Sequence, residues 1–285
     1  MPAIATAPTA GPVPPRLGTA RSPGRAHRAL SDAGTLALRV LLYYRHSPGL
    51  IAVSLAAPLA MLVVFGYVFG SAMRVPGGGG YRDYLMPGLF VLIAVNGIVP
   101  SMVGAARDLG LGVTDRLRSM PISRSAALLG QTLADLIVSA VILAMMVGVA
   151  LATGWRFHDG PARALAALAL LLLFRFVANW VGIYLGLLAG REEIAGQLSL
   201  LIFPLGMVTN VFVPADGMPA WLRAVAEWNP ISAAAAAARD LFGNAAPAAT
   251  PWPLHHPVLA TVGWCALLLA VFAPLAVRKF TTHGR

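Results

Sequence analysis

Six long apolar runs, broken by only two charged side chains, constrain this chain more than any other feature of its sequence. The two interruptions are Asp135 and Arg175. A helix needs about 20 apolar residues to cross a hydrocarbon core about 30 Å thick, and backbone groups in lipid must be satisfied within the segment. We therefore predict an all-α integral membrane fold with six transmembrane helices, in which Pro and Gly mark kinks and not breaks, at residues 49–72, 85–106, 126–152, 164–189, 194–213 and 257–277.

The composition excludes a soluble domain and a nucleic-acid-binding protein. Of the 285 residues, 58% are hydrophobic and only 11% are charged, against about 25% charged in ordinary soluble domains. The net charge of +10 is spread too thinly to track a phosphate backbone, so the anionic partner that it indicates is membrane lipid. The single cysteine, Cys265, is expected to be a buried apolar residue.

Three segments follow from the distribution of proline, charge and apolar residues. Residues 1–30 contain six prolines, four arginines and no acid, which indicates a disordered basic tail. Residues 31–47 place polar side chains on one helical face and apolar ones on another, as in a helix lying on the bilayer surface. Residues 48–285 form the predicted six-helix transmembrane domain.

The orientation is predicted from the basic residues in alternate connections. The tail, residues 107–124, Arg191 and the C-terminus carry 14 of the 21 Lys and Arg residues, whereas the opposite connections carry 6. The basic excess stays in the cytoplasm, so both termini are predicted to be cytoplasmic in a multi-pass protein of the cell membrane. This orientation places four tryptophans near the outer headgroups, namely Trp155, Trp221, Trp228 and Trp252.

The chain lacks the motifs of membrane enzymes and of nucleotide-binding proteins. No histidine lies in a predicted crossing, Asp135 is the only acid there, and no histidine or cysteine spacing typical of a metal site occurs. The phosphate-binding loop is absent, and the only lysine is Lys279 near the C-terminus. We expect no catalytic residue, metal or cofactor on this chain; any ATP and Mg would be bound by another subunit.

The basic connection at residues 107–124 can form a short docking helix. Thr114 can cap a helix that ends before Pro121, and Val113, Leu117 and Met120 then share one face. Such a helix suits a groove on a partner protein. A solvated loop that merely obeys the orientation rule is an equally good interpretation of these residues.

The connection after the fifth run predicts two short helices at the outer face. The first pairs Arg223 with Glu227 opposite an apolar stripe of Trp221, Leu222, Val225 and Trp228. Asn229 can cap a second helix that starts at Pro230 and ends at Gly243. We expect the two helices to cover the outer mouth of the bundle.

Three strings of residues resemble the ABC-2 type permeases, and among them the daunorubicin/doxorubicin-resistance exporter subunits. They are residues 112–123 (GVTDRLRSMPIS), residues 154–158 (GWRFH) and residues 212–232, which contain FVP, MPAWL and WNPIS. The resemblance implies two permeases side by side, identical or related, in a bacterial cell membrane with two copies of a cytoplasmic ATPase subunit.

The resemblance also implies roles for particular residues. The loop after the second crossing would be the helix that couples to the ATPase, through Arg107, Asp108, Asp115, Arg116, Leu117 and Arg118. Residues 216–241 would form an outer re-entrant gate, with gate residues Pro214, Met218, Pro219, Trp221, Trp228, Asn229 and Pro230.

The two charges in the apolar runs are predicted to pair. Counting 1.5 Å per residue, Asp135 and Arg175 both lie about 12 Å from the cytoplasmic ends of neighbouring antiparallel helices. Unpaired charges facing lipid are costly, so we predict a structural ion pair; a substrate or proton site is the functional alternative. Gly182, Gly186 and Gly190 form a small-residue ridge for close helix packing.

Together these features predict the membrane subunit of an ATP-driven exporter of amphipathic drug-like or lipid-like molecules. The alternative is an ion-coupled secondary transporter that uses Asp135 and has no ATPase. A membrane enzyme at the outer face is a third possibility, but His158, Asp159, His255 and His256 show no recognisable ligand spacing.

Overall fold

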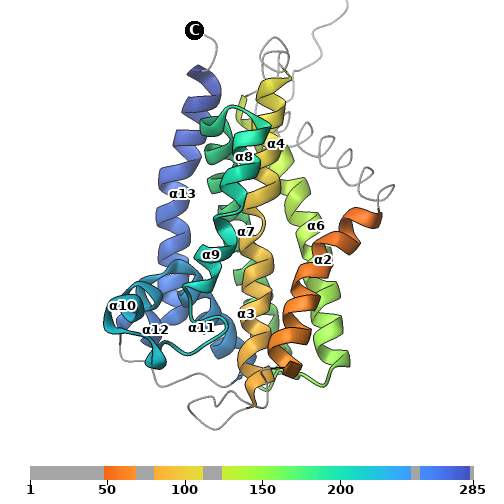
Figure 1. Cartoon of the computed structure of the whole chain (residues 1–285), viewed down its shortest axis with the longest axis vertical. Coiled ribbons are helices and arrows are strands. Elements are labelled where there is room, and N and C mark those ends of the chain that lie inside the picture. The colour runs from red at the N-terminus through yellow and green to blue at the C-terminus, as the bar shows by residue number, and fades with distance from the viewer. Residues whose placement is uncertain (1–47, 69–79, 112–123, 245–250, 283–285) are drawn as a thin grey trace, which may run out of the picture.

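The computed structural model of the chain describes residues 48–68, 80–111, 124–244 and 251–282 (Figure 1). Within those ranges all regular structure is helical, which confirms the predicted all-α class. The predicted tail, residues 1–30, and interfacial helix, residues 31–47, lie outside the described residues. The elements are α2 Pro48–Val63, η1 Val64–Val68, α3 Tyr81–Val95, α4 Ile98–Gly110, α6 Arg124–Ala152, α7 Gly160–Ala189, α8 Glu192–Ser199, α9 Ile202–Met207, η2 Ala215–Gly217, α10 Ala220–Trp228, α11 Pro230–Phe242, α12 Trp252–His255 and α13 Pro257–Thr282.

Four helical segments in the described residues are long and apolar enough to cross a membrane. They correspond to the second, third, fourth and sixth predicted crossings: Tyr81–Gly110, Asp135–Ala152, Gly160–Ala189 and Pro257–Phe280. The first predicted crossing appears as a shorter apolar helix, Leu55–Val68. The six-crossing arrangement therefore remains a prediction, and four of its members are long apolar helices.

The fifth predicted crossing is wrong as a continuous helix over residues 194–213. It consists of α8 and α9, and the helix ends at Met207. Pro204 has no N–H to donate to the carbonyl of Leu200, so the α-helical ladder is interrupted here. At the junction the hydrogen bond reaches back three residues and not four: the N–H of Leu200 donates to the carbonyl of Gln197 (3.2 Å). Proline in this run therefore marks a break.

The second crossing is kinked at Asn96–Gly97, between α3 and α4. Pro100 cannot donate a hydrogen bond to the Asn96 carbonyl, and the Gly97 N–H donates to the carbonyl of Ala94 (3.2 Å). In a regular helix that N–H would bond to Ile93 instead. The kink thus releases the Ile93 carbonyl for another donor while α3 and α4 remain one long column, as predicted.

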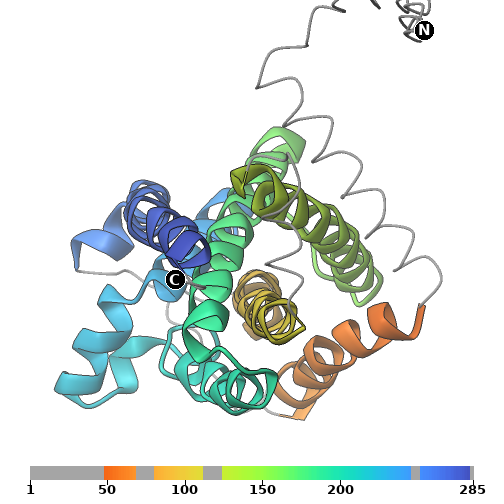
Figure 2. The same ribbon diagram turned by 90° about the horizontal axis from the view of Figure 1, so that it is seen from above.

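This column stands in the middle of the bundle (Figure 2), with α2, α6 and α7 around it and α13 packed on α7. Two glycines of the predicted ridge bring α7 close to α4. A Cβ atom on Gly182 would lie 2.5 Å from the Ile98 carbonyl oxygen, and one on Gly186 would overlap the Met102 carbonyl oxygen. Gly190 does not take part in this contact: it ends α7 in the left-handed conformation, with φ 72°.

Replacing Gly186 with alanine should lower the free energy of unfolding by about 2 kcal/mol, because the new methyl group must push the α4 backbone away. Gly148→Ala is the matched control in α6, where an added Cβ meets nothing within 4 Å. That change should be neutral or stabilising by up to about 1 kcal/mol. Denaturant unfolding in mixed micelles measures both, and equal effects of the two substitutions would contradict the close approach.

An aromatic cluster fixes the end of the bundle where α10, α11 and α12 gather (Figure 1). Trp155 stands edge-on to Phe90 of α3 and Phe242 of α11, with ring centroids 5.4 and 5.1 Å away. Trp155 is only 1% exposed, so its ring is packed inside the protein; its position near the outer face stays a prediction. The turn at Gly154, with φ 94°, carries this ring into the protein, whereas Trp221, Trp228 and Trp252 are exposed.

Candidate functional site

The two short helices predicted after the fifth run are present as α10 and α11. Arg223 pairs with Glu227 in α10 (Nε to Oε1, 2.8 Å). The Asn229 side chain accepts a hydrogen bond from the Ile231 N–H (2.9 Å), and Gly243 ends α11 with φ 67°. These local predictions are confirmed, and α11 lies inside the protein against α3, α7 and α13.

The predicted gate residues occupy the surface side of this segment. Pro214 precedes the short helix η2, Pro219 precedes α10 and Pro230 is the first residue of α11. Trp221 and Trp228 are more than half exposed. The Asn229 side chain also donates to the Val208 carbonyl (3.2 Å), which ties the start of α11 to the chain beyond α9. Their role as a gate remains a prediction.

A buried arginine that the sequence analysis did not single out is the centre of this region. Arg239 of α11 is completely buried. Its Nε donates to the Tyr84 carbonyl (2.9 Å), and its Nη2 donates to the carbonyls of Asn210 (2.9 Å) and Val211 (3.1 Å). The guanidinium also lies over the Tyr84 ring, 3.7 Å from its centroid. Arg239 therefore joins α11 to α3 and to the chain that follows α9.

Residues 209–212, which follow α9, need these donors because they are not helical and so lack helical hydrogen bonds. Buried carbonyls without a hydrogen bond are costly, and residues 209–212 are all buried. The Tyr84 hydroxyl donates to the Asn210 carbonyl (2.5 Å), and the Tyr81 hydroxyl donates to the Phe212 carbonyl (2.9 Å). Two tyrosines and Arg239 thus replace the helical hydrogen bonds that this segment lacks.

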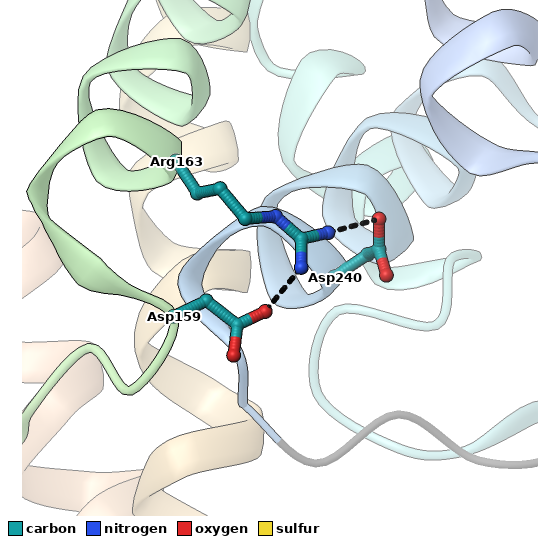
Figure 3. A network of polar contacts seen from close by, with 3 residues as sticks. All are labelled: Asp159, Arg163 and Asp240. Carbon is teal, nitrogen blue, oxygen red and sulfur yellow. Dashed lines mark hydrogen bonds and ion pairs between the residues drawn. The ribbon is translucent and has the colours of Figure 1, made fainter.

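The last turn of α11, which carries Arg239, makes a second polar contact (Figure 3). Arg163, at the start of α7, donates to Asp159 (2.5 Å) and to Asp240 of α11 (3.3 Å). The side chains are exposed, so their contribution to stability is small. The His158 N–H bonds to the Phe242 carbonyl (2.8 Å) in the same turn. The helix α11 is consequently held by polar contacts at its start, through Asn229, and in its last turn.

Two of the predicted coupling residues, Arg107 and Asp108, lie at the opposite end of the α3–α4 column. Arg107 is exposed and Asp108 is half-buried, in the last turns of α4. Asp115, Arg116, Leu117 and Arg118 lie outside the described residues. The column α3–α4 thus has the Arg239 contacts near its first turn and the predicted coupling segment directly after its last.

The structure brings Asp135 of α6 and Arg175 of α7 to one cavity inside the helix bundle. Its volume is about 490 Å³, and its walls come from α2, α3, α4, α6 and α7. Asn96 and Ser139 are its other polar lining residues, and the rest of the lining is apolar. The positive charge of Arg175 acts electrostatically on the Asp135 carboxyl group. The two charges are neighbours, and their pairing stays a prediction.

Arg175 also supports the kink between α3 and α4. Its Nη1 donates to the Ile93 carbonyl (3.3 Å), the group that the kink releases. The guanidinium lies against Gly97, where a Cβ atom would overlap it. Only glycine therefore leaves room for this arginine. The sequence analysis missed this contact; Gly97 and Pro100 within an apolar run indicate a kink but do not identify Arg175 as its partner.

Four long apolar helical segments, one of which is the central column, define a multi-pass helical membrane protein. The model of the family described as ABC-2 type transporter matches residues 33–242. A daunorubicin resistance ABC transporter permease protein, DrrB1 of Streptomyces coeruleorubidus, is 31% identical over 96% of this chain and 94% of its own length. The probable doxorubicin resistance permease DrrC of Mycobacterium tuberculosis is 24% identical over 94% of this chain and 96% of its own.

The chain belongs to the ABC-2 type transporter family. The resemblance noted in the sequence is thereby confirmed. A putative transport permease, ycf38 of the alga Pyropia yezoensis, is also similar, at 23% identity over 77% of this chain and 76% of its own. The chain is therefore a transport component, and its apolar helices indicate a multi-pass membrane protein.

Proposed function

We propose that this chain is the permease subunit of an ATP-driven exporter that moves amphipathic molecules, drug-like or lipid-like, out of a bacterial cell. ATP and Mg are bound by two copies of a separate cytoplasmic subunit, and the pore forms between this chain and a second, identical or related permease. Full-length similarity to permeases named for daunorubicin and doxorubicin resistance supports the cargo class. The basic excess at residues 107–124 supports cytoplasmic termini and a cytoplasmic coupling segment.

The α3–α4 column is the observation that carries the mechanism. It continues from the contacts of Arg239 to the start of the coupling segment, and Gly182 and Gly186 hold it tightly against α7. Closely packed helices transmit displacement as rigid bodies. Closure of the ATPase pair pushes residues 112–123, the column moves with them, and α11 moves with α3 because Arg239 joins the two. The permease itself performs no covalent chemistry.

Co-purification with the ATPase subunit tests the proposal. Substituting Arg116 or Leu117 with alanine should reduce permease-dependent ATP hydrolysis roughly tenfold, within the usual range of coupling energies. Arg191→Ala is the control, because Arg191 is an exposed arginine after α7, outside the coupling segment, and it should change hydrolysis little. Vesicles that contain only this chain and accumulate solute on a proton or sodium gradient would overturn the proposal and favour the secondary transporter.

A further inference from the structure

The cavity between α2, α3, α4, α6 and α7 has a polar part and an apolar part. Asp135 of α6 and Arg175 of α7 supply one negative and one positive charge to the lining, and Asn96 and Ser139 add an amide and a hydroxyl group. The remaining lining consists of alanine, proline, valine and isoleucine. The volume of about 490 Å³ lies within the usual range for pockets that bind small molecules. The cavity is therefore suited to a compact amphipathic molecule.

A second, smaller cavity extends the apolar part. Its volume is about 60 Å³, and it shares Ala57, Pro58 and Asn96 with the larger cavity. Its other lining side chains are apolar and come from α2, α3, α9 and Phe212. An apolar tail can extend from the larger cavity in this direction, toward the chain that Arg239 holds.

The charges of the cavity determine which polar head it accepts. Asp135 and Arg175 together carry no net charge, and the surroundings are apolar. A head with a single charge would leave a net charge among largely apolar lining residues, which is unfavourable. A head with one positive and one negative group keeps the site neutral and can place each group beside its opposite.

We propose that this cavity is a binding site, within one permease subunit, for small zwitterionic amphipaths, with the head at Asp135 and Arg175 and the apolar body along α2. The proposal rests on the proposed export of amphipathic molecules and names a site and a head-group class for them. Arg175 keeps its hydrogen bond to Ile93 throughout, so the guanidinium is held in place for the ligand by the kink of α3 and α4.

Three probes with one apolar body and different charges test the site. They are para-butylphenylalanine, a zwitterion; para-butylphenethylamine, a cation; and para-butylphenylpropanoate, an anion. Calorimetric titration of the full chain in nanodiscs, with empty nanodiscs as the blank, should show the zwitterion binding about tenfold more tightly than either singly charged probe. Binding in nanodiscs needs no ATPase, so its failure is distinguishable from failure of the exporter proposal.

Asp135→Asn keeps the shape of the side chain and leaves the cavity with a net positive charge. The anion should then bind more tightly than the zwitterion, which reverses their order. Glu193→Gln is the matched control, since Glu193 is an exposed acid in α8 outside the cavity lining, and it should keep the wild-type order. Val103→Phe fills the cavity without changing its charge and should abolish binding of all three probes.

Two outcomes would overturn the proposal. One is wild-type protein that shows no binding above empty nanodiscs. The other is an order of the three probes that Asp135→Asn leaves unchanged. If Asp135→Asn fails to fold, the Val103→Phe variant provides the test. Wild-type binding in that variant would show that the ligand binds outside this cavity and would overturn the proposal.

Discussion

Replacing Arg239 with methionine should lower the free energy of unfolding by about 3 kcal/mol, although no acidic residue is among its hydrogen-bond partners in the described part of the chain. The substitution removes a donor from the buried carbonyls of Tyr84, Asn210 and Val211. The Asn210 carbonyl keeps the Tyr84 hydroxyl, and each group that is left unsatisfied costs about 1–3 kcal/mol. Relief from burying the charge offsets part of this loss, since a guanidinium in a dry interior is itself unfavourable.

Two further variants separate the charge of Arg239 from its geometry. Arg239→Lys keeps the charge but not the planar fork that reaches α3 and the segment after α9 together, so it should recover less than half of the loss. Arg163→Met removes an arginine whose side chain is 47% exposed and should cost at most about 1 kcal/mol. Denaturant unfolding in mixed micelles measures all three.

Local opening should accompany the loss of stability. Because Arg239 and the two tyrosines hold residues 209–212, protease cleavage near these residues should be faster in Arg239→Met than in Arg163→Met. An Arg239→Met protein with the stability and the cleavage rate of the wild type would show that α11 is held to α3 by its alanines and Phe242 alone.

The parts of this region that the sequence predicted are those fixed by near neighbours. The Asn229 cap involves residues two apart, and the Arg223–Glu227 pair involves residues four apart on one helix. Gly243 ends α11 because the left-handed conformation favours glycine. Such patterns are readable in a single sequence, because the backbone of one helix brings the partners together.

The Arg239 cluster could not be predicted in the same way, because its partners are distant in the sequence. Its contact with Tyr84 joins residues 155 positions apart. A weaker signal did exist: Arg239 lies on the same helical face as Ala235 and Phe242, both of which are buried. An arginine in the middle of an apolar face indicates a buried cation, but it does not identify the carbonyls that receive it.

The broken fifth crossing shows where hydropathy alone was insufficient. Residues 194–213 are as apolar as a membrane helix, yet Pro204 interrupts the helix between α8 and α9, and α9 ends at Met207, before Asn210. The unwound carbonyls are acceptable only because side chains of α3 and α11 supply donors. The apolar character of the run gave no information about these donors, and so the prediction of one continuous helix failed.

Replacing Arg175 with leucine should be about as destabilising as the loss of Arg239, at roughly 3–5 kcal/mol. The change leaves Asp135 without a nearby positive charge in a largely apolar cavity and leaves the Ile93 carbonyl without its donor. Asp135→Asn should cost less, because Arg175 then still bonds to Ile93. The same unfolding measurement compares the two variants.

Exchanging the two charges then tests whether they pair. Asp135→Arg combined with Arg175→Asp should regain part of the stability and export lost in the single variants, but not all, because an aspartate at position 175 has no N–H for Ile93. No recovery would contradict the ion pair. Complete recovery would contradict the role of Arg175 at the kink. Gly97→Ala gives an independent measure of that role, since its methyl group displaces the guanidinium and leaves both charged residues in the chain. It should therefore reproduce part of the Arg175→Leu defect, whereas Gly110→Ala, at the open end of the same column, should not.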